Sequence, residues 1–152
     1  MNEPNKIRPI VLGVAKRNNK ILVGKGFDKV KNEVFYRALG GGIDFGETSS
    51  DALKREFLEE INAHITVKDY LGVEENIFTY KGKLCHEIVF LYSIEIPESE
   101  YKDEYIVNDD AGEYYSTWID IDEFKSQKKY FIQKIFLNIF SHTYLTGSYC
   151  FI

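Results

Sequence analysis

The stretch that decides the fold runs from Leu39 to Ala63 and reads LGGGIDFGETSSDALKREFLEEINA. Gly40, Gly41 and Gly42, followed by Gly46, predict a glycine-rich turn, because residues without a Cβ accept positive φ and let a ligand approach the backbone. We expect a helix to follow from Glu47 onward, with Thr48 or Ser49 as its N-cap. The strand that leads into the turn is predicted over residues 34–39.

The predicted helix carries three carboxylates on one side. At 3.6 residues per turn, Glu56, Glu59 and Glu60 span roughly 100° of arc. An apolar stripe adjoins them, made of Leu53, Phe57 and Ile61. Like charges at this spacing destabilise a helix by a few tenths of a kcal/mol, so their grouping favours a hard cation such as Mg²⁺ or Mn²⁺ among them. A solvated acidic face is the alternative for the three glutamates taken alone.

The glycines and the glutamates together form a longer pattern. From Gly41 the chain reads G-x5-E-x7-R-E-F-x-E-E-x-N-A. This resembles the box of the Nudix hydrolase superfamily, G-x5-E-x7-R-E-U-x-E-E-x-G-U, where U is a bulky apolar residue. The matching residues are Gly41, Glu47, Arg55, Glu56, Phe57, Glu59 and Glu60. Asn62 replaces the last glycine and Ala63 is a weak final apolar residue, but Asn tolerates the left-handed region in which we expect the helix to close.

The resemblance implies a fold and a chemistry. The fold is α+β, an α/β/α sandwich with a curved mixed sheet between helices, here as a single domain over residues 1–152. Nudix enzymes hydrolyse a nucleoside diphosphate linked to another group, with water attacking the pyrophosphate. By similarity, Glu56, Glu60 and the Gly41 carbonyl are the principal ligands of Mg²⁺ or Mn²⁺. Glu59 is a further ligand or the general base, since family members differ on this point.

Further site residues follow from the same resemblance. Arg55 is predicted to pair with Glu47 or Glu59 and to orient it. Arg37, shortly before the glycines, is predicted to meet a substrate phosphate, with a strand-edge charge as the alternative. Gly42 is predicted to present its backbone to the substrate.

A glutamate from beyond the box completes the set of candidates. Many relatives recruit one just before a strand that carries Trp, here Trp118. Glu113 is the first candidate and Glu104 the second. Because the box carboxylates are all present, we favour an enzyme over a nucleotide-sensing module of the same fold; an isomerase of this fold has no support beyond the box. Nucleotide sugars such as ADP-ribose, nucleoside triphosphates and dinucleoside polyphosphates all remain open as substrates.

Composition limits the remaining classes. The 152 residues are 44% hydrophobic and 28% charged, as in a soluble globular protein. The net charge of −5 argues against a stable nucleic-acid partner. No run approaches the roughly 18 apolar residues of a membrane span. With no signal pattern and only Cys85 and Cys150, far apart, we expect reduced thiols and a cytoplasmic protein. Nudix proteins are often dimers, so the resemblance also admits a homodimer.

The other elements are predicted from period and turn residues. We expect a hairpin over 7–24, a polar loop over 27–32, a strand over 65–71 and a second hairpin from 76–80 and 84–96. Residues 97–112 carry six acids and one lysine, which predicts a solvated loop. A strand over 114–119, a short helical turn over 120–124 and a helix over 130–144 complete the prediction.

Overall fold

The structure of the protein is a computed structural model that describes residues 6–109, 112–126 and 129. Within these residues the chain forms eight strands, two α-helices and a short 3₁₀ helix. In chain order they are β1 Ile7–Arg17, β2 Lys20–Asp28, β3 Glu33–Arg37, β4 Leu39–Gly42, α1 Ser49–Ile61, β5 Thr66–Tyr80, β6 Lys83–Glu95, η1 Glu98–Glu100, β7 Glu104–Asp109, β8 Gly112–Asp120 and α2 Ile121–Lys125. The helix predicted over residues 130–144 lies outside the described residues.

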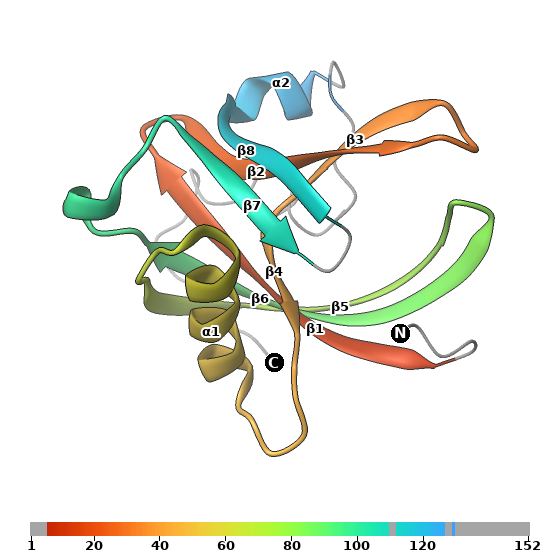
Figure 1. Cartoon of the computed structure of the whole chain (residues 1–152), viewed down its shortest axis with the longest axis horizontal. Helices are drawn as coiled ribbons and strands as arrows, with labels where there is room; N and C mark the ends of the chain where they lie inside the picture. The colour runs from red at the N-terminus through yellow and green to blue at the C-terminus, as the bar shows by residue number, and fades with distance from the viewer. Residues whose placement is uncertain (1–5, 110–111, 127–128, 130–152) are drawn as a thin grey trace.

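The strands form one mixed sheet that curves around α1 (Figure 1). The order along the sheet is β5-β6-β1-β2-β8-β7, with β3 added to β2 and β4 added to β1. β1 and β6 run parallel, whereas the other pairs run antiparallel. This confirms the predicted fold class, an α+β arrangement with a curved mixed sheet and a helix packed on it.

β1 runs through the centre of the sheet and is buried on both faces. Its α1-facing side packs on the apolar stripe of the helix, which is buried as predicted. The residues in this contact are Val11, Ala15, Leu53, Phe57 and Ile61. Its other side packs against β6 and α2 through residues such as Leu12, Leu91 and Phe124. The two cores hold α1 and the neighbouring strand β4 in fixed positions.

Both ends of α1 follow the predicted capping. Thr48 is the N-cap, and its hydroxyl accepts a hydrogen bond of 3.2 Å from the Asp51 backbone N–H. Asn62 ends the helix in the left-handed region, with φ 52° and ψ 42°, and its N–H donates to the Leu58 carbonyl at 3.1 Å. The replacement of the last box glycine by Asn is therefore accommodated by the backbone. The helix begins two residues later than Glu47.

The glycine-rich turn was predicted correctly at Gly46 but not at the three earlier glycines. Gly40, Gly41 and Gly42 form most of β4 and pair with β1, and the turn lies in the following residues 43–48. At Gly40 the φ of +142° and the close approach of the Val11 carbonyl leave no room for a Cβ. The glycines are thus required by tight strand packing as much as by chain reversal.

The solvated loop predicted over residues 97–112 is also wrong, because it contains η1 and the strand β7. In β7 the exposed residues Glu104, Ile106 and Asn108 alternate with Tyr105 and Val107, which are buried in the core under α1. Counting charges over the segment hid this alternation of buried and exposed side chains along the strand.

Smaller differences concern strand bounds. The two strands predicted at 65–71 and 76–80 are one strand, β5, with register shifts between Val67 and Gly72. Phe27 and Asp28 end β2 rather than opening a loop. The strand predicted over 34–39 is divided, since β3 ends at Arg37 and β4 begins at Leu39. In the described part of the chain, no helix has the length and apolar character needed to cross a membrane.

Candidate active site

Gly41 lies directly beneath a carboxylate of α1. β4 pairs with β1 so that Gly41 faces Val11, and both lie on the side of the sheet that α1 covers. A Cβ at position 41 would overlap the Glu56 carboxylate, so only glycine lets that carboxylate rest on the strand. Glu56 is only 14% exposed, and burial raises its pKa, although the Arg55 guanidinium opposes the shift.

Arg55 ties the helix to the loop and to β4. Its Nε and Nη2 donate to the two oxygens of Glu47, each at 2.9 Å. Nη2 also donates to the Gly42 carbonyl at 3.0 Å, while Nη1 donates to Glu56 at 3.0 Å and to Glu59 at 3.3 Å. Arg55 therefore contacts both of the glutamates that the sequence offered as alternative partners.

The charges around Arg55 reinforce one another. The hydrogen bonds from Arg55 lower the pKa of Glu47, and those to Glu47 raise the pKa of Arg55. Glu47 also accepts from the Asp44 backbone N–H at 3.2 Å, and the Asp44 carboxylate lies 3.7 Å from the Arg55 guanidinium. The loop at 43–48 is thus fastened to α1 by one cation among several anions.

Glu60 follows Glu56 by one helical turn and is more deeply buried, with 7% of its surface exposed. On the same side of the sheet, Arg37 ends β3, and its guanidinium lies 4.0 Å from the Asp109 carboxylate of β7. Burial acts to lower the pKa of Arg37, but Tyr114, Glu60 and Asp109 outweigh it and the pKa is raised. The predicted phosphate ligand thus already lies among protein anions.

The two glutamates proposed from beyond the box lie differently. Side chains alternate along a strand, and Tyr105 and Tyr114 point to the face that α1 covers. Glu104 and Glu113 are their direct neighbours, so both point to the opposite face. Asp109, two residues after the buried Val107, points to the α1 side instead. Asp109 and Tyr114 were not among the predicted site residues, although the apolar residues at 105 and 107 were a signal for the face on which Asp109 lies.

The carboxylates suit a hard divalent cation. Glu56, Glu59 and Glu60 offer oxygen donors, and the bare backbone of Gly41 lets the Glu56 carboxylate lie against the strand. In the described residues, no three His, Cys, Asp or Glu side chains are already gathered closely enough to hold a metal ion. The donor chemistry and the Gly41 position nevertheless fit the Mg²⁺ or Mn²⁺ that the resemblance implies.

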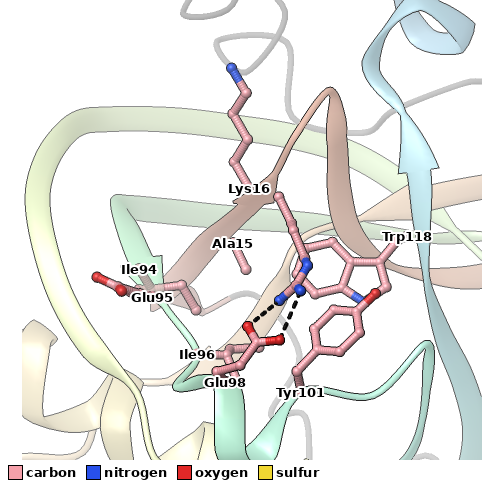
Figure 2. A pocket seen from close by; sticks show the side chains of 9 residues that line it. Ala15, Lys16, Ile94, Glu95, Ile96, Glu98, Tyr101 and Trp118 are labelled. Carbon is pink, nitrogen blue, oxygen red and sulfur yellow. Dashed lines mark hydrogen bonds and ion pairs between the residues drawn. The ribbon is translucent and has the colours of Figure 1, made fainter.

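A cavity of about 230 Å³ lies elsewhere, at the ends of β1 and β6. Figure 2 shows Glu98, Tyr101 and Trp118 around it. Arg17 also lines this cavity. None of the predicted site residues lines this cavity. The carboxylates and glycines around Arg55, rather than the cavity, therefore define the candidate site.

A mixed curved sheet whose glycine strand faces a glutamate-rich helix is the architecture of a Nudix protein. The NUDIX domain family model matches residues 6–138, and the chain belongs to this family. No curated protein matches the chain.

Solved structures show the same fold. A NUDIX hydrolase from Nitrosomonas europaea has 17% identity and a TM-score of 0.63, covering 90% of this chain and 87% of its own. An ADP-ribose pyrophosphatase from Streptococcus suis has 10% identity and a TM-score of 0.61, with 95% and 96% covered. A MutT NUDIX hydrolase from Burkholderia pseudomallei has 20% identity and a TM-score of 0.56, with 78% and 86% covered. At these identities the likeness concerns the fold alone.

Proposed function

We propose that this protein is a hydrolase that depends on Mg²⁺ or Mn²⁺ and cleaves a pyrophosphate bond in a nucleoside diphosphate linked to another group. The observation that carries the proposal is the Glu56 carboxylate resting on Gly41, with Arg55 fixing the surrounding loop. This arrangement assembles box residues that are far apart in the pattern. Membership of the Nudix family supports the same class of reaction.

Each box residue has a role in the proposal. Glu56, Glu60 and the Gly41 carbonyl hold the ion, which when bound supplies charge neutralisation at the phosphates and a more acidic water. Arg55 keeps Glu47 and the loop in position, as its hydrogen bonds to Glu47 and Gly42 suggest. Glu59 is 61% exposed, so its carboxylate, which also accepts a hydrogen bond from Arg55, can reach a water and take its proton.

The remaining candidates are ranked by their surroundings. Glu113 and Glu104 stay as alternative bases, although neither shares a face of the sheet with α1. Arg37 and Gly42 are the residues proposed to meet the substrate phosphates. The substrate is a small nucleotide, and the related folds include an ADP-ribose pyrophosphatase and a UDP-X diphosphatase. Nucleotide sugars therefore stand beside nucleoside triphosphates as the classes to test first.

The test is a substrate panel with the full chain. Nucleotide sugars, nucleoside triphosphates and dinucleoside polyphosphates are incubated with Mg²⁺, with Mn²⁺ or with EDTA, and the released products are identified. We expect cleavage of one class with metal and none with EDTA. Nucleoside monophosphate with pyrophosphate identifies a triphosphate substrate, and AMP with ribose phosphate identifies ADP-ribose.

A matched pair of variants separates this site from background activity. Glu56→Gln should abolish the metal-dependent cleavage, whereas Glu95→Gln, which removes an exposed carboxylate paired with Lys68, should retain it. If no substrate of the panel is cleaved while calorimetry still shows nucleotide and metal binding, the proposed hydrolase activity is overturned and a nucleotide-sensing module is favoured.

A further inference from the structure

The loop between β4 and α1 carries a phenylalanine whose side chain lies in solvent. Phe45 has a relative exposure of 109%, the highest value among the large apolar residues in the described part of the chain. The loop projects from the sheet at the start of α1 (Figure 1). Burying an apolar side chain favours folding, and at this position the protein forgoes that gain. An exposed apolar residue alone is ordinary, so its place in the loop decides what it can do.

Phe45 lies at the corner of a tight turn. The Glu47 N–H donates to the Asp44 carbonyl at 3.1 Å, which closes a β-turn over residues 44–47. Gly46, the third residue of this turn, has φ +84°, as a type II turn requires at that position. Proline is common at the second position of such turns, whereas this chain places an aromatic ring there. The ring therefore extends from the corner of the turn into solvent.

Hydrogen bonds at both ends fix this turn beside the carboxylates of α1. Just before the turn, the Ile43 N–H donates to the Pro9 carbonyl of β1 at 3.1 Å. At its end, both oxygens of Glu47 accept from Arg55, which also donates to Glu56. A single guanidinium thus contacts both the turn and the carboxylate proposed to hold the ion. The aromatic ring is therefore held at the edge of the candidate site.

We propose that Phe45 is a stacking platform for the nucleobase of the substrate. The inference rests on the proposed function, in which the carboxylates of α1 hold the metal and the phosphates of a nucleotide. The base is the planar part of such a ligand, and every base has a face that can stack on an aromatic ring. Because this contact tolerates any base, Phe45 favours nucleotides over phosphates that lack a base and does not select one base by hydrogen bonding.

The experiment measures binding of ligands that differ only in the base. AMP, GMP and UMP share ribose and phosphate with ribose 5-phosphate, which has no base, and none of them has a pyrophosphate bond to cleave. Calorimetric titrations with Mn²⁺ present give each Kd for the full-length wild type, Phe45→Ala, Phe45→Tyr and Tyr115→Ala. Tyr115→Ala is the matched control, because it removes a half-exposed aromatic ring next to Ile106, on the face of the sheet that α1 does not cover.

We expect Phe45→Ala to raise the Kd of the nucleotides by about 5- to 150-fold, the range that corresponds to the energy of base–aromatic stacking. Its Kd for ribose 5-phosphate and for Mn²⁺ alone should change less than twofold, because the phosphate and metal contacts remain. Phe45→Tyr should bind nucleotides as the wild type does, since its ring also stacks. Tyr115→Ala should match the wild type for every ligand. Phe45→Ala should keep the melting temperature of the wild type, as expected for an exposed side chain.

Phe45→Trp gives a spectroscopic measurement of the same contact. Trp118, which lines the cavity described above, is the one tryptophan of the native sequence. A base that stacks on an indole ring quenches its fluorescence. With Mn²⁺ present, the emission of Phe45→Trp should therefore fall when a nucleotide is added and stay constant with ribose 5-phosphate. The emission of the wild type, which comes from Trp118 alone, should respond to neither.

Three outcomes would overturn the platform. One is an unchanged nucleotide Kd in Phe45→Ala. Another is a wild type that binds nucleotides and ribose 5-phosphate equally, or binds neither. The third is an altered oligomeric state of Phe45→Ala in analytical ultracentrifugation with an unchanged nucleotide Kd, which identifies a contact with a second copy of the chain. If the wild type binds nucleotides through Phe45 but cleaves no substrate of the panel, the proposed hydrolase activity fails and the platform stands.

Discussion

Two arginines in this protein each donate two hydrogen bonds to one glutamate. Arg55 donates to Glu47 at 2.9 and 2.9 Å, and Arg17 donates to Glu98 at 2.7 and 2.9 Å. Arg17 also stacks on the Tyr101 ring, 3.8 Å from its centroid, at the wall of the cavity in Figure 2. The two ion pairs are nearly identical in geometry, yet only one belongs to the candidate site.

The difference lies in what surrounds each pair. Arg55 reaches three further acceptors, the Gly42 carbonyl and the carboxylates of Glu56 and Glu59, whereas Arg17 is covered by an aromatic ring. An exposed arginine–glutamate pair alone is a structural contact of small effect. Around Arg55 several carboxylates surround one cation, and the glycines of β4 beside them carry no side chains. A metal ion could bind to such carboxylates, and a phosphate could approach the bare backbone.

The largest effect is expected from the carboxylates near Gly41. Glu56→Gln and Glu60→Gln should each lower kcat by about two to three orders of magnitude at saturating Mg²⁺, because each removes a charge that stabilises the transition state. Melting curves should show that both variants remain folded. Glu98→Gln, which removes the carboxylate of the other pair, should keep a kcat within twofold of the wild type. Near-normal turnover in Glu56→Gln or Glu60→Gln would contradict the assignment of that glutamate as a metal ligand.

Gly41→Ala tests the contact between strand and helix. The added Cβ overlaps the end of the Glu56 side chain, which must move, and a displacement of about 1 Å at a reacting centre costs about 10²-fold in rate. Gly40→Ala is the comparison, because its Cβ would meet the backbone carbonyl of Val11. We expect Gly41→Ala to lose activity but keep its melting temperature, and Gly40→Ala to unfold at lower temperature. Full activity in Gly41→Ala would contradict the contact.

Local features of this site were predictable from the sequence. Helix geometry fixes the relative positions of Arg55, Glu56 and Glu59 as soon as the helix is recognised, and the left-handed end at Asn62 follows from backbone preferences. The burial of the stripe at Leu53 and Phe57 followed from the same periodicity. All of these depend on neighbours within two turns of one helix.

Features that depend on distant partners were not predictable. Gly41 lies in a strand because it pairs with Val11, thirty residues earlier in the chain. Asp109 lies beside Arg37 because β7 and β3 belong to the same sheet, and local composition does not specify that pairing. The acids of residues 97–112 predicted a loop because the sequence does not show that Tyr105 packs in the core under α1.

Replacing each arginine by lysine sharpens the comparison of the two pairs. Lysine keeps the charge but cannot reproduce the planar set of donors, so Arg55→Lys should lose the contacts to Glu47 and Gly42 together. We expect kcat to fall by about 10- to 100-fold, as for other residues that orient metal ligands. Arg17→Lys should change kcat less than twofold. An equal fall in kcat in the two variants, measured in steady-state assays, would show that the groups around each ion pair do not determine its role in catalysis.

The smallest effect is expected at the pair that lies outside the site. The hydrogen bonds from Arg17 lower the pKa of Glu98 below its ordinary value of 4.5. The contribution of this pair to stability is therefore present in full above pH 4.5 and is lost as the pH falls through the lowered pKa. Because Glu98 is 77% exposed, we expect Glu98→Gln to lower the melting temperature at pH 7 by only about 1–3 °C.

Melting curves of the wild type and of Glu98→Gln between pH 7 and pH 3 test this directly. The difference in melting temperature should shrink below pH 4.5 and should also shrink at pH 7 when salt is added. Arg17→Gln should give the same profile, and the double variant should lose no more than either single one, since all three break a single interaction. A difference that stays constant with pH would show that Glu98 acts through packing on the cavity wall rather than through its charge.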